Sequence, residues 1–104
     1  KRSEIKIACF GLSFKPNIDD LRESPALNIA KKISSLKFNK VLIVEPNITQ
    51  LPIGFDKSVT LVSLENAIEA ADIVVLLVDH KQFIDIDLSL LTDKQIVDSR
   101  GIWS

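Results

Sequence analysis

The stretch IKIACFGLSFKPNIDDLRESPALNIAKKI, residues 5–33, decides the fold because it contains a strand, a long loop and a helix in that order. Residues 5–10 are apolar except for one lysine, which predicts a strand buried on both faces. Apolar residues recur at helical spacing over residues 26–33. Ser24 and Pro25 form a typical helix start, with a capping hydroxyl before a residue whose missing N–H needs no partner. The stretch therefore predicts the first crossover of a parallel sheet.

The rest of the chain repeats this alternation. A second helix is predicted over residues 64–71 with Ser63 as its cap, and residues 85–94 form a weaker segment of about one helical turn. Further apolar runs rich in Ile and Val predict four more strands, at residues 41–44, 59–62, 73–78 and 95–97. We expect residues 1–104 to form one α/β domain of Rossmann-like, doubly wound type. Five buried parallel strands in the order 3-2-1-4-5 would lie between two helical layers.

Composition excludes several classes of partner. Of the 104 residues, 46% are hydrophobic, and 13 basic against 14 acidic side chains give a net charge of −1, so no basic face for nucleic acid is predicted. The single cysteine, Cys9, precludes an internal disulfide, and no apolar run approaches the roughly 20 residues of a membrane span. Both features fit a cytoplasmic protein. Because the chain has no methionine, we expect it to be an excised piece of a longer protein.

The loop over residues 11–25 follows the first strand, at the edge where α/β sheets bind ligands. It is about four times as long as a usual strand-to-helix turn. It is not a G-x-G-x-x-G dinucleotide motif, because Ser13 and Pro16 occupy the second and third glycine positions. Instead, Lys15 and Arg22 offer two cations near the free N–H groups of the following helix, and together these groups suit an anion.

These loop residues also have a purely structural interpretation. In that interpretation Lys15 is solvated and Arg22 pairs with Asp19 or Asp20. Phe14 either folds back onto the core or stacks on a bound ligand. The residues alone leave both alternatives open.

Polar residues also follow the fourth and fifth strands. Asp79 and His80 follow the fourth and are candidates to line the same crevice. Arg100 follows the fifth, where its guanidinium either binds a phosphate or carboxylate or ties down Asp98. As the only histidine, without a Cys or Ser beside it in the sequence, His80 is expected to order a loop instead of acting as a catalytic base. Three strand ends thus direct polar groups toward one edge.

No other residue indicates catalysis. Cys9 lies inside a strand, where a thiol usually behaves as a small hydrophobe. Glu45 follows the second strand and is interpreted as a turn residue, because the glycine loop that accompanies a ribose-binding acid is absent. No cluster has metal-ligand spacing, and no nucleophile with its base can be assembled. We therefore expect neither a metal site nor a catalytic residue in this chain.

The loop GLSFKPNIDDLRESP, residues 11–25, closely resembles a motif of the UDP-glucose/GDP-mannose dehydrogenase family, and residues 78–80 and 98–100 are similar to that family's C-terminal domain. The resemblance implies a C-terminal, UDP-binding domain of a bacterial enzyme that uses two NAD to oxidise a sugar C6 alcohol to a carboxylate. It places the catalytic cysteine, the N-terminal NAD domain and a central dimerisation segment outside this chain. The whole enzyme would be a homodimer or larger, whereas residues 1–104 alone would be monomeric and inactive.

The same resemblance assigns roles residue by residue. Phe14 and Lys15 match residues that line the substrate sugar and hydrogen-bond it. Arg22 matches an arginine that contacts the NAD phosphates, and Arg100 matches one that contacts the UDP-sugar. Cys9 does not match the family's nucleophile. The loop is most similar to members that oxidise UDP-N-acetylmannosamine for surface polysaccharides, then to those acting on UDP-glucose, and more distantly to those acting on GDP-mannose.

Two functions of other classes were weighed against this one. A phosphoacceptor receiver domain shares the five-stranded plan, but its acceptor aspartate should end the third strand, where this chain has Leu61-Val62-Ser63. A stand-alone nucleotide-binding regulatory module would also use an anion-binding crevice. The absence of methionine argues against the regulatory module, and an upstream dinucleotide motif with a catalytic cysteine would decide for the enzyme.

Overall fold

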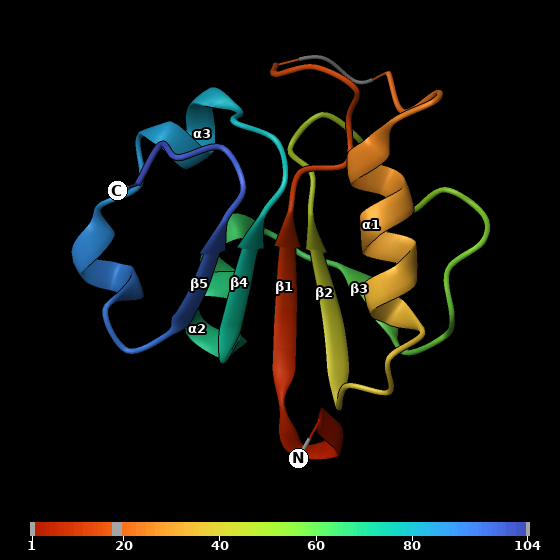
Figure 1. Cartoon of the computed structure of the whole chain (residues 1–104), viewed down its shortest axis with the longest axis horizontal. Coiled ribbons are helices and arrows are strands. Elements are labelled where there is room, and N and C mark those ends of the chain that lie inside the picture. Colours follow the sequence, from red (N-terminus) through yellow and green to blue (C-terminus); the bar gives the residue numbers. More distant parts are fainter. Residues whose placement is uncertain (1, 18–19, 104) are drawn as a thin grey trace.

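The computed structural model describes residues 2–17 and 20–103 and confirms the doubly wound α/β fold. Its sheet has five parallel strands in the order β3-β2-β1-β4-β5, as predicted. Figure 1 shows all five with their carboxyl ends at the same edge. The strands are β1 (Lys6–Phe10), β2 (Lys40–Val44), β3 (Val59–Leu61), β4 (Ile73–Leu76) and β5 (Gln95–Asp98).

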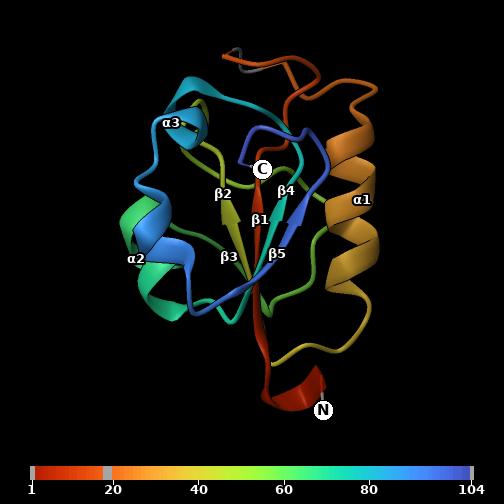
Figure 2. The same ribbon diagram turned by 60° about the vertical axis from the view of Figure 1, so that its left-hand side comes forward.

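Helices cover both faces of this sheet (Figure 2). On one side lies α1 (Pro25–Ser34), and on the other lie α2 (Leu64–Ala70), α3 (Lys81–Ile84) and the 3-10 helix η2 (Leu88–Leu91). A further 3-10 turn, η1 (Arg2–Glu4), precedes β1. The chain moves outward from β1 to β3 and then returns to β4 on the opposite side of β1, so the strand order reverses between β1 and β4. In such sheets that reversal is where ligands bind.

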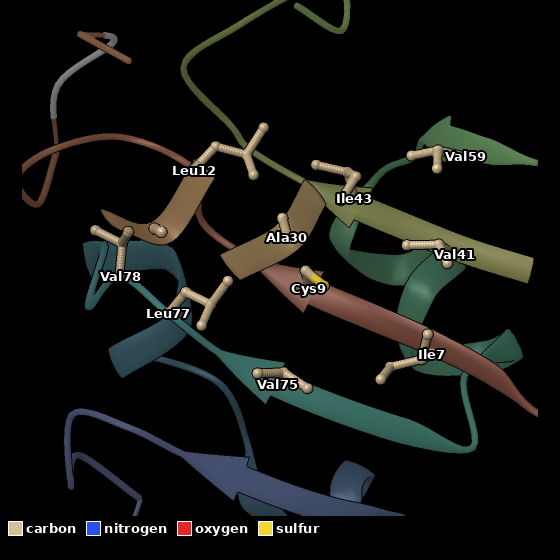
Figure 3. Packing of buried hydrophobic residues seen from close by; sticks show 11 residues of the cluster. Ile7, Cys9, Leu12, Ala30, Val41, Ile43, Val59, Val75, Leu77 and Val78 are labelled. Carbon is tan, nitrogen blue, oxygen red and sulfur yellow. The ribbon is translucent and has the colours of Figure 1, made fainter. Parts of the chain in front are cut away.

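Alternate residues of β1 build two separate cores. Cys9 faces α1 and packs with Ala30 and Ile43 in the first cluster (Figure 3). Phe10 faces the other side, where its ring lies 4.9 Å from that of Phe83. Burial raises the pKa of the Cys9 thiol to about 12, so it stays protonated at neutral pH. This confirms Cys9 as a core hydrophobe.

Both long helices begin where their caps predict. The Ser24 hydroxyl accepts a hydrogen bond from Leu27 N at 3.3 Å, ahead of Pro25 at the first helical position. The Ser63 hydroxyl accepts one from Asn66 N at 3.1 Å and starts α2. Each cap satisfies a backbone N–H that the helix leaves without an internal partner.

The structure differs from the sequence predictions in three details. β4 ends at Leu76 and not at Val78, because Leu77 N and Val78 N both donate to Phe10 O, which bends the chain out of the sheet. Residues 81–84, for which the sequence predicted no element, form α3. β5 is not buried, since Val97 is 52% exposed on an edge strand that the described helices cover incompletely.

No helix in the described part of the chain has the length and apolar character needed to cross a bilayer.

Gly11 ends β1 in a conformation that other residues rarely adopt. Its φ is 98°, and its N–H donates to Val44 O at 2.8 Å. A Cβ at this position would lie 2.6 Å from the Cβ of Val78 and 3.0 Å from its backbone nitrogen. Glycine therefore lets the chain that leaves β1 pass against the chain that leaves β4.

Gly11→Ala should destabilise the fold by about 2–4 kcal/mol, because left-handed strain adds to a clash with backbone atoms that cannot move away. Denaturant unfolding of the two proteins measures the difference. Gly101→Ala is the matched control, since Gly101 has φ 72° but no atom within 4 Å of its added Cβ. It should lose only about 1 kcal/mol. Equal losses at the two positions would contradict the close approach at Gly11.

Candidate functional site

A cleft of about 430 Å³ opens at the carboxyl edge of the sheet, where β1, β4 and β5 end beside the start of α1. It lies at the reversal of strand order, and the three strand ends meet there as the sequence predicts. Its walls are mainly apolar, and Arg100 is the one charged residue among the described residues that form them. The lining residues are Ser13, Phe14, Pro25, Ala26, Ile29, Leu77, Val78, Ser99 and Arg100.

Phe14 separates this cleft from a second hollow. The second hollow, of about 440 Å³, is lined by Phe14, Asp20, Arg22 and Glu23. The Phe14 side chain is 46% exposed, so it does not fold back onto the core. Its backbone N–H donates to Asp20 O at 2.8 Å, which closes the loop beneath the ring. An exposed aromatic ring between two hollows is available to stack on a ligand in either.

The two cations of the loop differ in their surroundings. Lys15 is exposed beside Phe14, with its ammonium nitrogen 6.0 Å from the ring centroid, and it lines neither hollow. Arg22 is 88% exposed and pairs with Asp20 through contacts of 3.1 and 3.2 Å. These hydrogen bonds lower the pKa of Asp20. Arg22 is therefore paired with an acid of its own loop, which was the alternative to anion binding, and the partner is Asp20. Asp19 lies outside the described residues.

Arg100 pairs with a different acid from the one the sequence suggests. Its Nε lies 3.7 Å from Asp79 Oδ1, and not against the carboxylate of Asp98. Asp98 instead accepts backbone N–H groups, from Arg100 at 3.0 Å and Gly101 at 2.7 Å on one oxygen and from Trp103 at 2.8 Å on the other. Burial alone would raise the pKa of Asp98, but these backbone donors outweigh it and lower the pKa. Asp98 thus shapes the turn that points Arg100 into the cleft.

His80 is fully buried, so the expectation that it lines the crevice is wrong. Its Nδ1 accepts a hydrogen bond from Asn17 N at 2.7 Å, which places the proton of the neutral ring on Nε2. Nε2 lies 2.9 Å from Glu45 Oε1 and 3.2 Å from Ser13 Oγ. The histidine therefore orders the loop after β1, as the alternative to catalysis predicted. Asp79 is half-buried and contributes to the cleft only through Arg100.

Glu45 is the residue that the sequence analysis missed. Glu45 does begin a turn, since its carbonyl accepts from Ile48 N at 3.2 Å, but its side chain is buried and only 2% exposed. One carboxylate oxygen accepts from Leu12 N at 2.8 Å, Ser13 N at 3.1 Å and the His80 ring, and the other accepts from the backbone and side-chain N–H groups of Asn47. The available signal was an acid directly after the second strand, at the ligand-binding edge. Apart from Asn47, its partners lie more than 30 residues away in sequence, so the pattern could not identify them.

The charge on Glu45 is stabilised by these donors. Burial would raise the pKa of the carboxyl, but hydrogen bonds from His80, Leu12 and Asn47 overcome that effect and hold the pKa below its ordinary value of 4.5. A lowered pKa in the folded state means that ionised Glu45 stabilises the fold above pH 4.5. That contribution is lost as the pH falls through the folded-state pKa.

Glu45→Gln should therefore reduce the free energy of unfolding by about 2–3 kcal/mol at neutral pH, because a neutral amide weakens several charge-assisted hydrogen bonds. Below pH 4.5 the difference from the wild type should narrow as the pH falls toward the lower folded-state pKa, at which the wild-type carboxyl becomes neutral too. Urea unfolding across this pH range tests both points. Glu69→Gln, at an exposed position of α2, should change stability little at any pH. A gap that stays constant with pH would contradict an ionised Glu45.

Comparison with known proteins agrees with the resemblance found in the loop. The model of the UDP-glucose/GDP-mannose dehydrogenase family, UDP binding domain, matches residues 8–104. The chain is 52% identical to UDP-N-acetyl-D-mannosamine dehydrogenase of Salmonella typhi over 99% of its length, and that stretch is 24% of the relative. It is also 52% identical to NDP-N-acetyl-D-galactosaminuronic acid dehydrogenase of Ralstonia nicotianae, over 94% of this chain and 23% of the relative. The chain thus spans about a quarter of the relatives it matches.

A solved structure shares the fold. The UDP-D-ManNAc dehydrogenase of Pyrococcus horikoshii superposes with a TM-score of 0.77 at 31% identity. The match covers 100% of this chain and 23% of that protein.

Proposed function

The chain belongs to the UDP-glucose/GDP-mannose dehydrogenase family, as its UDP-binding domain, and from this we propose that it binds the substrate of an NAD-dependent dehydrogenase. The substrate is UDP-N-acetylmannosamine, whose C6 hydroxyl is oxidised in two steps to the carboxylate. The observation that carries this proposal is 52% identity to such an enzyme over nearly the whole chain. The cleft at the strand-order reversal is the matching feature of the structure.

The remainder of the enzyme lies outside residues 1–104 in this proposal. An N-terminal domain binds most of the NAD and supplies the catalytic thiol, and a central segment forms the dimer. Cys9 is unsuited to that chemistry, because it is buried and its pKa is about 12. A location in the cytoplasm, where NAD and nucleotide sugars are made, fits an oxidoreductase of polysaccharide synthesis.

Each residue proposed for the site has a role that its surroundings support. The Arg100 guanidinium is 3.7 Å from Asp79, too far for a strong hydrogen bond, so it is available to the diphosphate of UDP. Phe14 lines the position of the sugar, and Lys15, beside it, donates to a sugar oxygen near the reacting carbon. Arg22 exchanges Asp20 for the NAD phosphates, which is feasible because an exposed ion pair contributes little stability.

The identity of the sugar has a second candidate. The Ralstonia relative matches this chain with the same 52% identity as the Salmonella relative, and its name specifies an N-acetylgalactosaminuronic acid product. Both names contain a sugar with an N-acetylated amino group. We therefore rank UDP-glucose and GDP-mannose as weaker candidates for the substrate than the two N-acetylated sugar nucleotides. The configuration of the sugar is read by contacts shared with the rest of the enzyme.

The proposal is tested by titrating this chain with UDP, UDP-N-acetylmannosamine, UDP-N-acetylgalactosamine, GDP and NAD while amide NMR shifts are recorded. UDP ligands should perturb residues around Ser13, Phe14, Ser99 and Arg100, which line the cleft. Perturbation by GDP in place of UDP would reject the uridine assignment.

Arg100→Ala should weaken UDP binding by about tenfold or more, because a charge-assisted contact to phosphate is lost. Arg22→Ala is the matched control, since Arg22 lines the second hollow and not the cleft. It should leave UDP affinity unchanged and weaken NAD binding in the whole dehydrogenase. Calorimetry measures both affinities, and an equal loss of UDP binding in the two variants would contradict the division between the two hollows.

A further inference from the structure

Two buried side chains hold the loop that carries Phe14 and Lys15, although neither of them lines the cleft. Glu45 and His80 are 2% and 0% exposed, and their side chains lie 2.9 Å apart beneath the loop. They come from the ends of two strands that flank β1 on opposite sides. A contact between them spans the sheet edge directly under the loop.

We propose that the Glu45–His80 pair is a positioning device that presents Phe14 and Lys15 to the sugar of the nucleotide-sugar substrate. This inference rests on the proposed function, and it assigns roles to two residues that do not contact the substrate. Its basis is the set of contacts that the pair makes on both sides of the Phe14–Lys15 segment.

The pair fixes both ends of a short exposed arch, which consists of residues 14–16. Before the arch, Leu12 N and Ser13 N donate to Glu45 Oε1. After it, Asn17 N donates to His80 Nδ1 at 2.7 Å. Ser13 adds a contact from within, because its hydroxyl donates to Lys15 O at 2.7 Å while lying 3.2 Å from His80 Nε2. The backbone of Lys15 is therefore held through the same pair.

Asn17 fits this anchor in two ways. Its φ of 62° is a left-handed conformation that asparagine tolerates better than most residues. Its side-chain oxygen accepts from Lys81 N at 2.8 Å, next to His80 in the chain. The far end of the arch is thus attached to the start of α3 by both the backbone and the side chain of one residue.

Apolar packing cannot place the arch. Leu12 is buried in the core and Leu21 packs against it, so among the described residues of the loop hydrophobic contact anchors those toward its ends. Among the described residues between them, Ser13 is buried but polar, and Phe14, Lys15, Pro16 and Asn17 are exposed. Polar contacts therefore set the position of Phe14 and Lys15, namely those with the Glu45–His80 pair and the hydrogen bond from Phe14 N to Asp20 O at 2.8 Å.

His80→Gln and His80→Asn separate the two anchors. The amide nitrogen of glutamine lies as many bonds from Cα as Nε2 does, so His80→Gln keeps a donor to Glu45 and loses the acceptor for Asn17 N. The oxygen of asparagine matches Nδ1, so His80→Asn keeps the acceptor and loses the donor. Asn17→Gly provides a second test at an exposed site, because glycine tolerates the φ and only the side-chain contact with Lys81 N disappears.

The measurement is steady-state kinetics of the whole dehydrogenase with UDP-N-acetylmannosamine and UDP-N-acetylgalactosamine, together with inhibition by UDP. His80→Gln should raise KM for the better sugar nucleotide by about ten- to a hundredfold. The inhibition constant of UDP should change less than about twofold, because Arg100 stays in place. Asn17→Gly should also raise KM, by a smaller factor. His80→Asn should raise KM less than His80→Gln does.

Ser63→Ala is the matched control for stability. It removes the cap of α2, which destabilises the fold without touching the loop, and it should leave the ratio of sugar-nucleotide KM to UDP inhibition unchanged. Positioning is overturned if His80→Gln and Asn17→Gly leave that ratio at the wild-type value, or if Ser63→Ala shifts it equally. A wild-type enzyme that oxidises neither sugar nucleotide and is not inhibited by UDP overturns the proposed function itself, and this inference with it.

Discussion

The site depends on the desolvation of one carboxylate. An ionised acid taken out of water needs several donors, and Glu45 obtains them from the backbone of the loop after β1, from His80 and from Asn47. Because a buried carboxylate needs several hydrogen-bond donors, few conformations of the loop can supply them. The same contacts that keep Glu45 charged therefore determine where the exposed loop residues lie.

This arrangement reverses the usual use of an acid at the end of the second strand. In dinucleotide-binding folds such an acid faces the ligand and binds a ribose. Here both oxygens of Glu45 are occupied inside the protein, and the chain leaves β1 through Gly11 without the further glycines that would cradle a pyrophosphate. The fold is shared with dinucleotide-binding domains, but here the cleft is lined by the loop after β1 and by Arg100, which follows β5.

Several residues at and near the cleft are exposed or only loosely paired within this chain. Phe14 belongs to two hollows, and Arg22 and Arg100 each pair with an acid at the surface. β5 leaves apolar side chains exposed, Val97 among them. The Salmonella typhi relative is about four times as long as this chain, and in the proposed function these features form one wall of a larger site.

The sequence by itself determined the strands, their order, both long helices with their serine caps, and the strand ends at which the site lies. These follow from apolar periodicity and local hydrogen bonds, which neighbouring residues specify. Only the tertiary structure decided the partners of charged and polar groups: Asp79 for Arg100, and His80 and the β1 loop for Glu45. Such pairs join residues distant in the chain, and a local pattern cannot state whether an acid is solvated or buried among donors. The short helix α3 and the exposure of β5 escaped prediction for the same reason, because each depends on what the rest of the fold covers.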